Sequence, residues 1–113
     1  KCFKNVRSMF AMTAHILYKK IDNKNCATHS SKVIKDVIRK KLNFNGILIS
    51  DDISMKSLKH DVVKNANEAL KAGCNLALYC NGKFKDNKKL LKQLPTIDDF
   101  TKKKTTVFYK LMS

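Results

Sequence analysis

Two adjacent carboxylates, Asp51 and Asp52, are the residues of this chain best placed to do chemistry. They follow a short apolar run, residues 47–49, that begins directly after Gly46. A strand buried on both faces reads as a continuous apolar run, and such strands are typical of parallel sheets. Parallel α/β folds carry their catalytic groups at the C-terminal ends of the strands. The pattern therefore favours a buried strand that presents an acid at its end, although paired carboxylates are also typical of a helix N-terminus.

Apolar runs and helical periodicities alternate along the rest of the chain. Asn45-Gly46 and Asn81-Gly82 are turn signals, Gly73 stands where a helix C-terminal cap belongs, and Pro95 ends a helix. Strands that alternate with helices imply right-handed crossovers and a parallel sheet, so the predicted fold class is α/β with one domain. The expected strands are residues 9–14, 47–50 and 76–80, and the expected helices are 32–42, 62–72, 85–94 and 98–111, the first capped by Ser30 or Ser31.

The chain is strongly basic, with 24 Lys and Arg against 9 Asp and Glu and a formal net charge of +15 over 113 residues. Such a charge favours the binding of polyanions by electrostatic attraction alone. The lysines are spread along the whole chain, however, whereas a nucleic-acid site is a clustered patch. We therefore interpret the charge as a compositional bias on solvated faces, and we expect no specific nucleic-acid partner.

The four cysteines form no CxxC pair and show no zinc-site spacing, so the sequence predicts no metal ion. The chain has no signal peptide and no apolar run near 18 residues, so nothing in it argues for secretion or a membrane. It begins with Lys1 rather than Met, which leaves the true start open.

Three blocks in a fixed order resemble one known family. They are residues 11–28, with Ala-Met-Thr-Ala-His-Ile at their start, residues 46–56, Gly-Ile-Leu-Ile-Ser-Asp-Asp-Ile-Ser-Met-Lys, and residues 72–82, Ala-Gly-Cys-Asn-Leu-Ala-Leu-Tyr-Cys-Asn-Gly. The chain thereby resembles the bacterial β-N-acetylhexosaminidases of glycoside hydrolase family 3, which remove N-acetylglucosamine during peptidoglycan recycling. It departs from the family at Cys26, where Pro is usual, and at Asn75, where Asp is usual.

The resemblance implies a (β/α)8 TIM-type barrel, of which residues 1–113 would be the last three strand–helix units. A complete barrel needs roughly 250 residues, so the N-terminal part is expected to be absent. The parent enzyme would be a cytoplasmic hydrolase without cofactors that acts on N-acetylglucosamine-containing muropeptides. The fragment alone would be inactive.

The resemblance makes Asp51 the catalytic nucleophile of a retaining glycosidase. Successive strand side chains point to opposite faces, so Asp52 cannot flank the same sugar bond. We expect Asp52 to cap the following loop or to hydrogen-bond a neighbouring strand end. The family's acid/base, a His oriented by an Asp, would precede residue 9 and lie outside this chain.

Three further side chains leave alternatives open. His15 follows a strand and is either a pocket residue or a hydrogen-bonded loop histidine, and Met55 is either a pocket wall or core packing. His29 and His60 are expected to be solvated.

Two other interpretations are alternatives to an inactive fragment. In one, a complementary N-terminal barrel polypeptide supplies the missing strands. In the other, a non-enzymatic basic remnant binds polyanions, with steeply salt-dependent affinity.

Overall fold

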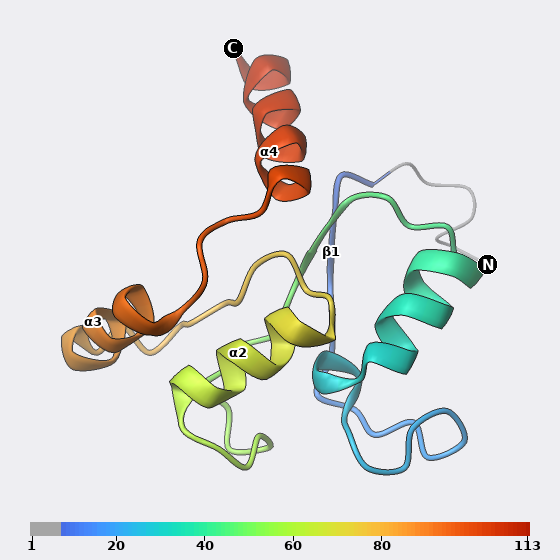
Figure 1. Ribbon diagram of the computed structural model, residues 1–113, viewed down its shortest axis with the longest axis vertical. Helices are drawn as coiled ribbons and strands as arrows, with labels where there is room; N and C mark the ends of the chain where they lie inside the picture. The colour runs from blue at the N-terminus through green and yellow to red at the C-terminus, as the bar shows by residue number, and fades with distance from the viewer. Residues whose placement is uncertain (1–7) are drawn as a thin grey trace.

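The structure is a computed structural model that describes residues 8–113, and Figure 1 shows its course. Strand β1 runs through the middle of the view between the helices, and the last helix, α4, projects away from the body toward the C-terminus (Figure 1). The described part is flattened, with extents of 42 × 40 × 20 Å. The elements in chain order are β1 (Phe10–Met12), the 3-10 helix η1 (Ala27–His29), the π-helix η2 (Lys32–Lys41), β2 (Ile47–Ile49), α2 (Val62–Ala72), α3 (Phe84–Gln93) and α4 (Asp99–Met112).

The sheet is parallel, as predicted, and β1 pairs with β2 in the register Phe10↔Ile47. The predicted third strand is wrong as a regular strand, because residues 76–80 are held to β2 by one bridge, Ile49↔Leu76. Beyond this bridge the Ile53 N–H still donates to the Leu78 carbonyl at 2.9 Å, but side chains replace some of the other ladder partners. The Ser50 hydroxyl accepts a hydrogen bond from the Leu78 N–H at 2.9 Å. Residues 76–80 therefore run beside β2 and continue the sheet without regular strand pairing.

The first predicted helix exists, but it is wound more widely than an α-helix. Its N–H groups reach five residues back, as in the 2.8 Å bond from Leu42 to the carbonyl of Val37. The hydroxyl of Ser30 accepts from the Val33 N–H at 3.2 Å, so Ser30 caps this helix through its side chain. Just before it, the 3-10 helix η1 leads the chain from Cys26 to Ser30.

The helix that follows the acidic residues has the predicted bounds. Asp61 caps α2 by accepting from the N–H groups of Val63 and Lys64. Gly73 ends the helix with φ 123°, a conformation that L side chains rarely adopt, and a Cβ there would lie 2.8 Å from the side chain of Ile34. Helices α3 and α4 match their predicted positions to within about a residue, and Asp98 caps α4.

Two apolar clusters hold these elements together. One joins η2, β2 and α2, and its buried members are Ile34, Phe44, Leu48, Ala69, Ala72 and Cys74. The other packs the segment after the acidic pair against α2 and α3, through Ile53, Leu58, Val63, Ala66 and Leu90. The second cluster buries Ile53 completely, so the backbone immediately beyond Asp52 is anchored in the core.

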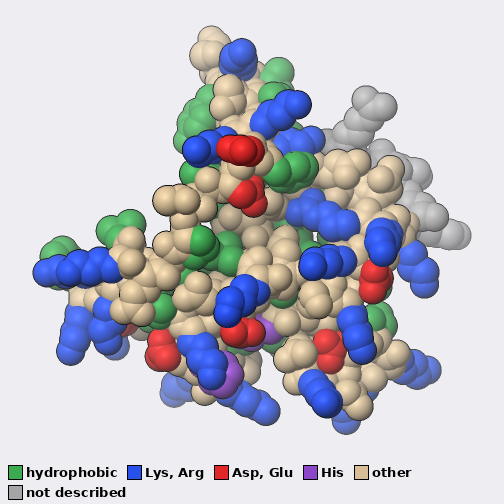
Figure 2. Space-filling model, in the orientation of Figure 1, with side chains coloured by type: hydrophobic (Ala, Val, Ile, Leu, Met, Phe, Trp, Pro, Cys, Tyr) green, Lys and Arg blue, Asp and Glu red, His purple; other side chains and the backbone are tan. Residues whose placement is uncertain are grey.

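The positive charge is spread over the surface. Figure 2 shows lysine and arginine side chains scattered over the visible face and along its left, lower and right edges, with acidic groups between them rather than one basic patch. No helix within residues 8–113 combines the length and apolar character needed to cross a membrane.

Candidate active site

Asp51 stands two residues beyond the last residue of β2, where the strand opens into a series of turns. Its side chain is half-buried, and Oδ1 accepts a 2.8 Å hydrogen bond from the N–H of Asp52. No other described residue bonds this carboxylate. The helix-cap alternative is wrong, because the next helix begins at Val62 and is capped by Asp61. Asp51 therefore presents a fixed carboxylate with an available oxygen at the C-terminal end of a parallel strand.

Asp52 has the supporting hydrogen bonds that the sequence predicted. Its Oδ1 accepts from the N–H of Ser54 at 3.0 Å and from the N–H of Cys80 at 3.1 Å. The Ser54 hydroxyl donates to Oδ2 at 2.7 Å. Burial raises the pKa of this carboxyl, but the hydrogen bonds from Ser54 and Cys80 outweigh burial, so the pKa lies below its ordinary value. An ionised Asp52 thus ties the turn after Asp51 to residues 76–80.

His15 reaches the same turn from the segment that follows β1. Its Nε2 lies 2.9 Å from the carbonyl oxygen of Asp52, and its Nδ1 lies 2.9 Å from the hydroxyl of Thr28. Since a carbonyl can only accept, Nε2 carries the donating hydrogen, and in the neutral ring Nδ1 accepts from Thr28. The Thr28 hydroxyl in turn lies 2.9 Å from that of Thr13, and both residues are buried. Both ring nitrogens of His15 are engaged, as in the hydrogen-bonded alternative.

Asn65 on α2 is a supporting residue that the sequence analysis missed. Its Nδ2 donates to the carbonyl of Ile53 at 3.1 Å and to that of His60 at 2.8 Å. Its side chain is 2% exposed, and Oδ1 is buried without a hydrogen-bond partner among the described residues. The sequence did contain a signal for it. Asn65 stands four residues before Ala69 and seven before Ala72, so this polar side chain falls on the apolar face of the helix.

Three other predicted positions are settled by their surroundings. Met55 is 43% exposed, so core packing is wrong for its side chain. His29 is half-buried and its Nε2 donates to the Asn65 carbonyl at 3.0 Å, which makes the prediction of a solvated His29 wrong. Burial lowers the pKa of His29. His60 is exposed, as predicted.

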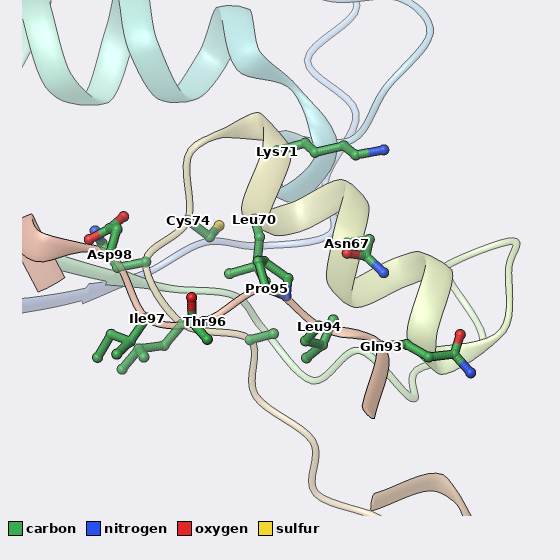
Figure 3. Close-up of a pocket in the computed structure, with 13 residues that line it drawn as sticks. Asn67, Leu70, Lys71, Cys74, Gln93, Leu94, Pro95, Thr96, Ile97 and Asp98 are labelled. Atoms are coloured by element: carbon green, nitrogen blue, oxygen red, sulfur yellow. The ribbon is translucent and has the colours of Figure 1, made fainter. Parts of the chain in front are cut away.

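A groove of about 840 Å³ opens elsewhere on the molecule. It runs between α2 and the segment that joins α3 to α4, and Figure 3 shows Leu70 extending from α2 toward Leu94 and Pro95. Asp51, Asp52 and His15 are absent from its lining. Across residues 8–113 no group of three or more His, Cys, Asp or Glu side chains is arranged to hold a metal ion.

Curated relatives match the chain over a limited part of their own length. It is 44% identical over 72 residues to a β-hexosaminidase of Methylobacillus flagellatus, which covers 62% of this chain and 20% of that protein. It is 40% identical over 91 residues to a β-hexosaminidase of Haemophilus influenzae, which covers 74% of this chain and 26% of that protein. The chain thus spans about a quarter or less of these relatives.

Solved structures show the same relationship. A glycoside hydrolase family 3 β-N-acetylglucosaminidase from Paenibacillus superposes with a TM-score of 0.71 at 30% identity, over 76% of this chain and 17% of that one. A β-N-acetylglucosaminidase from Thermotoga maritima covers 92% of this chain and 25% of its own, with a TM-score of 0.66 at 30% identity. The model of the glycosyl hydrolase family 3 N-terminal domain matches residues 4–106, and the chain therefore belongs to glycosyl hydrolase family 3.

Proposed function

We propose that this chain is the nucleophile-bearing part of a retaining β-N-acetylglucosaminidase and that Asp51 is the nucleophile. The observation that supports this role is the hydrogen-bond frame around one available carboxylate. Asp52, His15 and Asn65 fix the backbone just beyond Asp51, while Asp51 itself bonds only the Asp52 N–H among the described residues. A nucleophile needs such a fixed position and a free oxygen to attack.

In the proposed reaction, an oxygen of Asp51 attacks C1 of a terminal N-acetylglucosamine and the bond to the leaving oxygen breaks. An acid/base group donates a proton to that oxygen, then removes a proton from the water that hydrolyses the glycosyl ester. His15 is unsuited to this role, because its two ring nitrogens are occupied by Thr28 and Asp52. Met55, exposed beside the turn, would line the sugar pocket.

The proposed parent fold is a (β/α)8 barrel in which this chain supplies the last three strand–helix units. The acid/base and most of the sugar pocket would then belong to the rest of the barrel, so the 113-residue chain alone would not turn over substrate. Within the parent enzyme the substrate would be an N-acetylglucosamine-containing muropeptide of cytoplasmic peptidoglycan recycling. The spread of charge in Figure 2 gives no support to a polyanion-binding function.

A chimera tests the role of Asp51 directly. The matching 91-residue segment of the Haemophilus influenzae β-hexosaminidase is replaced by the corresponding residues of this chain, and hydrolysis of a chromogenic N-acetylglucosaminide is measured. We expect Asp51→Asn to lower kcat by roughly 10³-fold or more, because it removes the covalent route. Asp36→Asn, at an exposed carboxylate on η2, is the matched control and should leave kcat unchanged.

Covalent trapping supplies an independent readout. A fluorinated N-acetylglucosaminide that forms a slowly hydrolysed glycosyl-enzyme should add one sugar to the peptide that contains Asp51. Full activity of the Asp51→Asn chimera, or a label on another carboxylate, would rule out the proposed role.

A further inference from the structure

We propose that Thr28 is a positioning residue for the reaction at Asp51, because its hydroxyl fixes the ring state in which His15 holds the acidic turn. The inference rests on the proposed function and adds to it a buried side chain that acts on Asp51 through His15 and Asp52. Thr28 lies in η1, is fully buried, and has its hydroxyl oxygen 2.9 Å from the Nδ1 atom of His15.

The direction of each hydrogen bond in this group follows from the last acceptor. The carbonyl oxygen of Asp52 can only accept, so the Nε2 atom of His15, 2.9 Å away, carries a hydrogen. In the neutral ring Nδ1 is then bare, and the Thr28 hydroxyl must donate to it. A hydroxyl has a single hydrogen, so the Thr28 oxygen in turn accepts from the Thr13 hydroxyl at 2.9 Å. The hydrogen bonds therefore run in one direction, from the buried hydroxyls to the acidic turn.

The same direction continues through the backbone of the turn. The Asp52 carbonyl that His15 binds belongs to the peptide whose N–H, that of Ile53, donates to the Leu78 carbonyl at 2.9 Å. On the other side, the N–H of Asp52 donates to Oδ1 of Asp51 at 2.8 Å. Hydrogen bonds in such a series polarise and strengthen one another. Asp52 is thus held through both of its backbone groups, and the position of Asp51 depends on the bond from His15.

The 3-10 helix η1 holds Thr28 in place from both sides. The N–H of Ala27 donates to the Ile16 carbonyl at 2.8 Å, and the His29 ring donates to the Asn65 carbonyl at 3.0 Å. Thr28 is thereby fixed between the segment that follows β1 and helix α2. A buried side chain supported in this way can orient the ring that it contacts.

A protonated His15 is the competing arrangement. Its Nδ1 would carry a hydrogen and donate to Thr28, and the Thr28 hydroxyl would then donate to Thr13. The carboxylate of Asp52 interacts electrostatically with His15 and would favour this charge. The bond to the Asp52 carbonyl exists in both arrangements, but Thr28 donates to the ring only in the neutral one. The experiment distinguishes the two by the positions of the ring hydrogens.

The test uses the chimera with the Haemophilus influenzae β-hexosaminidase, its histidines labelled with heavy nitrogen for NMR. The His15 signals are assigned by their absence in His15→Ala. We expect a hydrogen on Nε2 and none on Nδ1 near neutral pH. Thr28→Val keeps the shape and removes the hydroxyl, so the Nδ1 signal should shift toward that of an unbonded nitrogen and the share of the Nε2–H form should fall. Thr28→Ser keeps the hydroxyl and should keep the parent spectrum.

Kinetics show whether Thr28 acts on catalysis through His15. Thr28→Val should lower kcat about tenfold and change KM less than about twofold, because the sugar contacts are kept while Asp51 is displaced. Thr28→Ser should retain most of the parent kcat. In the His15→Ala background the same Thr28→Val change should cost less than about twofold, since the side chain through which it acts is already missing.

The outcomes separate this inference from the proposed function. The spectrum does not require turnover, so a Thr28-dependent Nε2–H form in a chimera without hydrolysis supports the hydrogen-bond chain and counts against the glycosidase. In an active chimera, the positioning role is overturned if Thr28→Val keeps the parent kcat, or if its loss adds in full to that of His15→Ala. If Thr28→Val fails to fold, a hydrogen on Nδ1 of the unchanged chimera still overturns the proposal, and a bare Nδ1 supports it.

Discussion

The Nε2 atom of His15 donates to the carbonyl oxygen of Asp52 across 2.9 Å, and so joins the end of β1 to the turn that carries Asp51. The carbonyl of the next residue, Ile53, accepts a hydrogen bond from the Asn65 side chain. Two consecutive carbonyls are thus held by side chains from two different elements. Because the same backbone fixes the position of Asp51, these contacts connect packing to the proposed chemistry.

Replacing His15 should displace the Asp51 turn. In the chimera, His15→Ala removes the donor to Asp52 and leaves the buried Thr28 hydroxyl with one partner fewer. We expect a loss of unfolding free energy of about 1–2 kcal/mol and a fall in kcat of roughly 10- to 100-fold. Urea unfolding and steady-state kinetics measure the two effects. His60→Ala, at an exposed histidine just before the cap of α2, should change neither, and an unaltered kcat in His15→Ala would contradict a positioning role.

Replacing Asn65 should loosen the far side of the same turn. Asn65→Ala leaves the carbonyls of Ile53 and His60 without this donor, and a reduction of about 2 kcal/mol in unfolding free energy is expected. Hydrogen exchange at residues 53–60 should accelerate. Asn67→Ala is the comparison on the same helix, since Asn67 bonds only the Val63 carbonyl among described residues. Equal losses of unfolding free energy in the two variants would show that the two hydrogen bonds of Asn65 stabilise the fold no more than the single one of Asn67.

Asn75→Asp should stabilise the chain. The Oδ1 of Asn75 accepts from Arg39 at 2.7 Å and from the Leu48 N–H at 2.8 Å, while its Nδ2 donates to the Thr101 hydroxyl. A carboxylate would keep both acceptor contacts and make the Arg39 bond an ionic one, which outweighs the lost donor to Thr101. We expect a gain of about 1 kcal/mol.

Thermal unfolding of the chimera checks this gain, which corresponds to a rise in Tm of a few degrees. Asn75→Ala, which deletes all three bonds, should lower Tm. An Asn75→Asp variant that melts below the original chain would show that the lost Thr101 contact dominates.

Acid should destabilise the fold through Asp22. Its carboxylate accepts from the Lys24 N–H, the Ser30 hydroxyl and the Asn25 N–H, and these bonds hold its pKa well below the ordinary value. The unfolded chain has an Asp pKa near 3.9, so the unfolded state binds the proton more readily. The stabilisation is therefore complete above about pH 5 and is lost as the pH falls below about 4, toward the folded pKa.

The midpoint of urea unfolding between pH 3 and pH 6 measures this loss. Asp22→Asn should flatten the acid limb of the curve, while Asp36→Asn, at an exposed carboxylate paired with Lys40, should preserve it. The depressed pKa values of Asp52 and Asp98 add to the same limb. A curve as steep in Asp22→Asn as in the parent would assign the acid sensitivity to those other carboxylates.

The sequence by itself determined the α/β class, the bounds of α2 and the position of the acidic pair after β2. These features follow from local rules: apolar runs, helical spacing, Asp61 and Gly73 as caps. Strand alternation also predicted that the two carboxylates take different roles, while the assignment of Asp51 as the nucleophile came from the family resemblance.

Only the tertiary structure decided how the acidic turn is held. His15 and Asn65 lie 37 and 12 residues from the carbonyls that they bond, and no local pattern predicts such pairs. The third strand was predicted as regular because its apolar run satisfies the strand rule. Its pairing instead combines backbone bonds with bonds to the Ser50 hydroxyl and the Asp52 carboxylate, which accept from the Leu78 and Cys80 N–H groups in place of backbone carbonyls. Hydrogen bonds between distant residues are set by packing, and sequence periodicity records only which face is buried.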